Sequence, residues 1–273
     1  MKTNNEPLDS SGRPTISVGE HALAVIEVQN TFSKHSYYHA CARHVDELAD
    51  VWVKEDGPYS ATARWTSNSG IIEGMTRIKK FYGDNLMEHL KNLLASASRI
   101  IPEIKNIPEN LGIGFGHEMN FLTTPVIEIA GDGKTAKGIW YSPGVNLVGS
   151  VIEGGKTSMR GEWRMTKYGV DFMKEDGKWK IWHIRIYLDN APPGWSYENG
   201  KAVNAPHDVE GAGAPAGGAH GGKTTAGHPS SATSSISLKA NPDPYKPWSP
   251  THAQKIDPRL PEPYYTFSET FSY

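Results

Sequence analysis

Hydrophobic positions recur at helical spacing in the first hundred residues and alternate like strands in the next ninety. The helical spacing predicts one helix from Gly19 to about Phe32, a second from about Ala40 to Lys54 and a third from about Met75 to Ser98. A polar and aromatic junction, residues 35–39, separates the first two. In the second helix the expected buried residues are Val45, Leu48, Ala49 and Trp52.

The strand-like half contains two hairpin signals. Alternating runs cover residues 113–130, with a break at Pro125, then the segment that ends at Trp140, then 157–173 and 178–188. Gly-Asp-Gly-Lys at 131–134 and Glu-Asp-Gly-Lys at 175–178 each favour a tight turn, because Asp-Gly tolerates positive φ. Helices that precede a mostly antiparallel sheet indicate an α+β fold rather than a βαβ fold.

The last strand has no purely polar face, so both of its faces are expected to be covered. Regular alternation puts Trp179 and Ile181 on one face with His183, Arg185 and Tyr187. An imidazole, a guanidinium and a phenol are costly to bury without partners, so this face predicts a polar-lined pocket. The alternative is a structural network in which Arg185 pairs with Asp171 or Glu162.

Composition divides the chain into four parts. Residues 1–17 form a polar arm and 18–200 the folded domain, whereas 201–240, rich in Gly, Ala and Ser, are expected to form a flexible linker. Residues 241–273 combine seven prolines with many aromatic side chains. This tail is expected to lie extended across its own subunit or a neighbouring one.

Charge and hydropathy exclude several classes of partner. A net charge of −2 and a pI near 6.6 give no general attraction to nucleic acid or to anionic membranes. No run approaches the roughly 18 apolar residues of a membrane span, and no signal peptide is recognised. The single Cys41 excludes an intrachain disulfide and fits a reducing compartment. We therefore expect a cytoplasmic protein.

Motifs for cofactors are weak. His35 and His39 have the i, i+4 spacing of a helical metal pair, but no Glu lies between them and no third ligand is evident. Gly112-x-Gly-x-Gly116 precedes a strand and not a helix, so it is a poor dinucleotide signature. We predict that the protein binds neither a metal nor an organic cofactor.

Four segments carry a resemblance to a known family. Leu48–Trp52, Thr124–Ile129, Gly131–Ala136 and Tyr168–His183 resemble the SnoaL-like branch of the nuclear transport factor 2-like superfamily. The resemblance covers roughly residues 18–190 and implies a curved antiparallel sheet wrapped around N-terminal helices. Its relatives include scytalone dehydratase, ketosteroid isomerase and non-catalytic dioxygenase subunits. The aromatic tail is similar to that of γ-formaldehyde lyases that act on lignin-derived dimers.

The resemblance also implies a set of site residues. The family's helix tyrosine falls at Tyr37 or Tyr38, of which we favour Tyr38, and its strand histidine aligns near His117 or Asn120. Register favours Asn120 and proton chemistry favours His117. The expected catalytic residues are Tyr38, His117, Asn120, His183 and Arg185. The expected substrate-binding residues are Tyr37, His39, Trp140, Tyr168 and Tyr187.

These features together predict a cofactor-independent lyase that acts on a phenolic aromatic substrate. If the narrower resemblance holds, the substrate is a diaryl propanediol that releases formaldehyde and gives a stilbene. The alternatives are a dehydratase or isomerase of a polycyclic substrate and a non-catalytic subunit or binding protein. A homo-oligomer, dimer or trimer, is expected.

Overall fold

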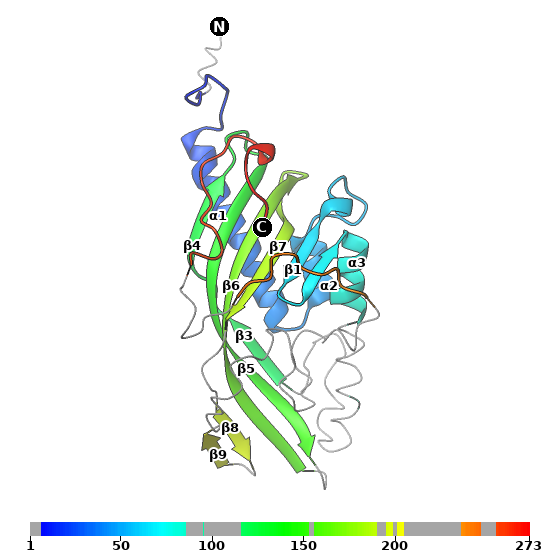
Figure 1. The fold of residues 1–273 in the computed structure, drawn as a ribbon. Helices are drawn as coiled ribbons and strands as arrows, with labels where there is room; N and C mark the ends of the chain where they lie inside the picture. The colour runs from blue at the N-terminus through cyan, green and yellow to red at the C-terminus, as the bar shows by residue number, and fades with distance from the viewer. Residues whose placement is uncertain are drawn as a thin grey trace.

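A computed structural model of the protein describes residues 7–85, 95, 116–152, 156–189, 195–198, 201–204, 236–246 and 255–273. The helices gather on one face of a long curved sheet (Figure 1). They are α1 (Val18–Ala40), α2 (His44–Val51), α3 (Met75–Lys79) and the π-helical turn η2 (Lys80–Asn85). Short 3-10 turns are η1 (Ser60–Thr62) and, in the C-terminal tail, η7 (Phe267–Glu269). No helix in the described part of the chain combines the length and apolarity of a membrane span.

Nine strands in the described residues join one sheet of order β2-β1-β7-β6-β5-β3, with β4 beside β5 and β8 between β6 and β9. They are β1 (Arg64–Ser67), β2 (Gly70–Glu73), β3 (Gly116–Asn120), β4 (Thr123–Ile129), β5 (Thr135–Ile152), β6 (Lys156–Glu175), β7 (Lys178–Asp189), β8 (Trp195–Glu198) and β9 (Lys201–Asn204). Every pair is antiparallel except β1 with β7. The predicted α+β class is confirmed.

The first helix is longer than its hydrophobic pattern predicts. A capping box starts it: the Ser17 hydroxyl accepts from the Glu20 amide, and the Glu20 carboxylate accepts from the Ser17 amide. It then runs to Ala40, so the prediction of a junction at 35–39 is wrong. His35 continues the buried stripe of Ala24, Val28 and Phe32. Because a histidine occupies this buried position, the hydrophobic pattern ended before the helix did.

The second helix is shorter than predicted and presents a different face. Its buried residues are His44, Glu47 and Val51, whereas Val45 is exposed. The spacing i, i+3, i+7 is helical, but two of its three members are polar. The third predicted helix is seen as α3 and η2; its remainder lies outside the described residues, apart from Ala95.

The β6–β7 hairpin confirms the predicted turn, with positive φ at Asp176 and Gly177. A bulge changes the faces of β7: Asp171 pairs with His183 while Phe172 pairs with Ile181. Because one residue is inserted, Ile181 faces the core and His183 faces away from it. The prediction that these two share a face is therefore wrong.

The tail lies on the face of the sheet opposite α1, as its orange and red trace shows (Figure 1). Lys239 pairs with Ile71 at the edge of β2, and Tyr273 packs on Gly169 in the middle of β6. Most of the predicted linker, 205–235, lies outside the described residues. Within the expected span 201–240, however, Lys201–Asn204 is strand β9.

Candidate active site

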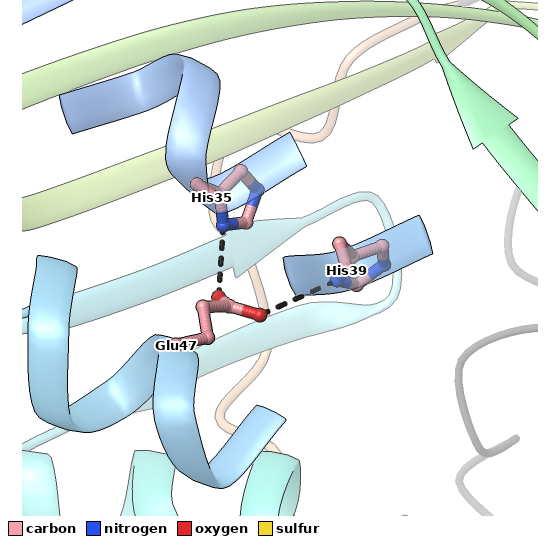
Figure 2. A group of neighbouring side chains, drawn as sticks. All are labelled: His35, His39 and Glu47. Atoms are coloured by element: carbon pink, nitrogen blue, oxygen red, sulfur yellow. Dashed lines mark hydrogen bonds and ion pairs between the residues drawn. The ribbon is translucent and has the colours of Figure 1, made fainter. Parts of the chain in front are cut away.

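A buried carboxylate lies where the C-terminal end of α1 meets α2. Glu47 has no exposed surface, and three imidazoles face it. His35 Nδ1 is 2.8 Å from Oε1, while His44 Nδ1 and His39 Nδ1 are 3.1 and 3.6 Å from Oε2. The Trp52 indole also donates to Oε1, at 3.1 Å. Figure 2 shows His35 and His39, one turn apart on α1, both directed at Glu47. We call these four residues, His35, His39, His44 and Glu47, the Glu47 cluster.

The electrostatics of the cluster favour an ionised carboxylate. Burial by itself raises the pKa of Glu47, because a charge loses its hydration. His35, by its charge and its hydrogen bond, and then His39 and His44 outweigh that effect, and the pKa lies well below the ordinary value. Oε1 accepts from His35 and Trp52 and Oε2 accepts from His44, so burial leaves neither oxygen without a partner.

Aromatic rings enclose the imidazoles. The Phe32 ring stacks on His35 with 5.1 Å between centroids, and Phe32 also lies 4.4 Å from Trp140. Tyr168 presents its edge to His35 at 6.2 Å. Tyr82, in the π-helical turn η2, lies 5.3 Å from His44. Polar groups held in such apolar surroundings act on one another through a low effective dielectric.

Three of the sequence-predicted substrate-binding residues lie at this cluster or within its aromatic surroundings: His39, Trp140 and Tyr168. Tyr38 is near but turned away, because its hydroxyl donates to Asp50 at 3.1 Å. That hydrogen bond, together with burial, raises the pKa of Tyr38. Tyr37 is 78% exposed, on the outer side of α1.

The two alternative strand residues lie in β3. Asn120 is opposite Gly144 in β5, and its carbonyl accepts from the Ser36 hydroxyl at 2.6 Å, so Asn120 borders α1. His117 is in the same strand, opposite Leu147. The side chain of His117 lies outside the described part of the structure. A catalytic role for either residue stays a prediction.

The structure places His183, Arg185 and Tyr187 on the other face of the sheet, beneath the tail. His183 Nδ1 is 2.8 Å from Asp171 and its Nε2 is 3.0 Å from the Thr62 carbonyl. In the described part of the structure Arg185 does not pair with Asp171, and the side chain of Glu162 lies outside that part. It donates to the backbone and side chain of Asp243 in the tail.

Asp171 is the centre of this second polar group. Its carboxylate is fully buried, lies 2.6 Å from Lys137 Nζ, and accepts from the Ser272 hydroxyl and the Tyr273 amide. The rings of Phe267, Phe271 and Tyr273 surround the Lys137 ammonium at 4.5–5.0 Å. The tail thus supplies many of the contacts on this face, which supports the structural-network alternative with different partners.

Sequence reasoning missed Glu47. It identified His35 and His39 as a helical pair but predicted no metal, for lack of a third ligand. The structure supplies both Glu47 and His44 from the next helix. The available signal was the polar i, i+3 pair His44 and Glu47, in register with Val51. That pair signals buried polar chemistry once the helix is known to be amphipathic.

A family model described as a SnoaL-like domain matches residues 20–185. No curated protein matches the chain. Solved structures that resemble it include a protein of Novosphingobium aromaticivorans DSM 12444 assigned provisionally as a scytalone dehydratase, at 10% identity over 69% of this chain and 96% of that one, with a TM-score of 0.42. Another is hexachlorocyclohexane dehydrochlorinase LinA-type3 from Novosphingobium barchaimii LL02, at 14% identity over 70% and 100%, with a TM-score of 0.39. The family model spans more than half of the sequence, including the helices of the Glu47 cluster and the strands that cover it. The chain belongs to the SnoaL-like family.

Proposed function

We propose that the protein is a cofactor-independent lyase, in which the Glu47 cluster transfers protons to and from a small aromatic substrate. One observation supports the proposal above the others: a fully buried carboxylate faces three imidazoles inside an aromatic shell. Ionisable groups at the surface are solvated by water and need no such set of protein partners. A buried group of histidines around one acid is suited to holding a proton at a defined atom.

The roles follow from hydrogen-bond chemistry. A carboxylate only accepts hydrogen bonds, so His35 presents an Nδ1–H to Glu47. In the neutral imidazole, Nε2 then carries the lone pair and can act as a base. Glu47 also stabilises the imidazolium that forms when His35 takes a proton. His39, the least buried of the three imidazoles, would return a proton to the leaving oxygen.

The finer proposal concerns the bond that is broken. For a phenolic diaryl propanediol, protonation of the benzylic hydroxyl releases water and, as the phenol loses its proton, gives a quinone methide. Removal of the terminal hydroxyl proton then releases formaldehyde, and the electrons of the broken carbon–carbon bond restore the aromatic ring as a phenolate, which takes up a proton to give a phenolic stilbene. A dehydratase would stop after loss of water and of a carbon-bound proton. Both reactions use the same acid and base.

The test measures formaldehyde, stilbene absorbance and alkene products for chelator-dialysed protein with phenolic diaryl propanediols and related benzylic alcohols. Glu47→Gln keeps the size of the side chain but removes its charge, and we expect turnover to fall by roughly 10²- to 10⁴-fold. His183→Gln, on the opposite face, is the matched control and should retain turnover. If His183→Gln lost turnover and Glu47→Gln retained it, the catalytic residues would instead be those predicted from the sequence. Absence of turnover on every substrate would contradict the proposed substrate class.

A further inference from the structure

The Glu47 cluster has a second chemical capacity that proton transfer does not use. Its members come from two helices with compatible spacings: His35 and His39 at i, i+4 on α1, and His44 and Glu47 at i, i+3 on α2. Residues with these spacings lie on one face of a helix. Figure 2 shows His35 and His39 of α1 facing Glu47 of α2. His44 Nδ1 lies 3.1 Å from the same carboxylate, so three nitrogen donors and one carboxylate converge.

The separations suit a small cation. The nearest ligand atoms of His35, His39 and Glu47 all lie within 4.8 Å of one another. The three Nδ1–carboxylate distances are 2.8, 3.1 and 3.6 Å. Tetrahedral zinc with bonds near 2.1 Å places its ligand atoms about 3.4 Å apart. The three Nδ1–carboxylate distances lie on both sides of this value.

The surroundings of the cluster also match those of a metal ligand set. Trp52 donates a hydrogen bond to Glu47 Oε1 at 3.1 Å, and such an outer donor fixes the orientation of a ligating carboxylate. Phe32 stacks on His35 and Tyr82 lies beside His44, so neither ring can turn freely. His39 is the least buried of the four residues, so an ion could enter the cluster from the side on which His39 lies.

We propose that the Glu47 cluster binds one divalent first-row transition cation, zinc in the first instance, through three imidazoles and one carboxylate. Imidazole suits zinc, cobalt and nickel, whereas magnesium and calcium prefer oxygen ligands. The cation would bind to the same Nδ1 atoms that carry the protons hydrogen-bonded to Glu47. It would therefore block the proposed proton transfer, and bound zinc should inhibit the lyase. Binding itself does not depend on the proposed reaction.

The experiment uses the full-length protein after dialysis against a chelator. Cobalt(II) is titrated while its visible absorption is recorded, and zinc is then added to displace it. We expect one cobalt per chain with the strong absorption typical of low coordination number, and displacement by one equivalent of zinc. Glu47→Gln and His39→Gln should each weaken cobalt binding at least 100-fold. His39→Gln is included because it changes the least buried ligand and so disturbs folding least; circular dichroism checks each variant.

The control must separate this site from adventitious histidines. The chain carries His220 and His228 in a Gly-rich stretch, and a double variant that changes both to Gln should bind cobalt as the wild type does. Binding that disappears in this double variant, or that persists unchanged in folded His39→Gln and Glu47→Gln, would overturn the proposal, as would absence of binding by the wild type. Cobalt binding without turnover would refute only the proposed function, and turnover without binding only the metal site.

Discussion

At the scale of single residues, Asp171 joins the sheet to the tail. Burial raises its pKa, but the hydrogen bond from His183 and the charge of Lys137 outweigh burial and hold the pKa below the ordinary value. Ser272 and Tyr273 of the tail donate to the same oxygen. The folded protein therefore stabilises the ionised form of Asp171 relative to the unfolded chain.

The resulting prediction concerns acid stability. Since the folded pKa of Asp171 is depressed, its contribution to the free energy of unfolding is complete above the unfolded pKa of about 4 and is lost as the pH falls through the folded value. Asp171→Asn should be less stable at neutral pH and should lose less further stability between about pH 5 and 2 than the wild type. Urea unfolding at several pH values measures both. Exposed Asp46→Asn changes the formal charge equally and is the control; parallel pH curves for wild type and Asp171→Asn would contradict the prediction.

Residue types alone could not separate the two polar groups. His183 and Arg185 looked like pocket residues because alternation was assumed throughout β7, and no feature of the sequence marks the bulge opposite Asp171. Glu47 was missed because an acid at an exposed-looking helix position is common. Trp140 and Tyr168 were predicted as substrate-binding residues, Tyr168 through the family resemblance, which carries positional information that composition lacks.

At the scale of secondary-structure elements, α1 carries His35 and His39 of the Glu47 cluster at its C-terminal end and a capping box at its start. Ser17→Ala removes the hydroxyl that accepts from the Glu20 amide. We expect the free energy of unfolding to fall by about 1 kcal/mol, with cobalt binding unchanged because the cap is several turns from His35. Urea denaturation compares this variant with Ser10→Ala, in the turn before the helix. Equal stabilities of the two variants would show that the cap contributes nothing.

Helices and strands were predictable from the sequence where a single hydrophobic periodicity, helical or alternating, runs through the segment. The hairpin turn at Asp176–Gly177 and the strands around it were located correctly, because Asp-Gly leaves few conformations open. The boundaries of α1 and α2 were not, since histidines and a glutamate occupy buried positions there. The bonds that hold these polar groups in the interior form only once the two helices pack together.

At the scale of the whole molecule, the tail covers one face of the sheet, and its last residue, Tyr273, packs on Gly169 of β6. A methyl group at position 169 would lie 2.4 Å from the Tyr273 ring. Gly169→Ala should therefore displace the end of the tail without changing the helical face of the sheet. We expect faster protease cleavage in 255–273 and increased binding of a hydrophobic dye. Gly19→Ala, where a methyl group would meet no atom within 4 Å, is the control; identical digestion of all three proteins would contradict this seat for the tail.

The parallel pairing of β1 with β7 has a consequence for the order in which the protein can form. Arg64 of β1 lies opposite His183 of β7, so one segment must wait for the other to leave the ribosome. Trp140 and Tyr168, which pack against Phe32 and His35 of α1, also leave the ribosome well after that helix. Joining such distant segments also slows folding, because the intervening chain loses freedom first. The apolar stripe of α1 therefore lacks these partners until residue 168 has left the ribosome.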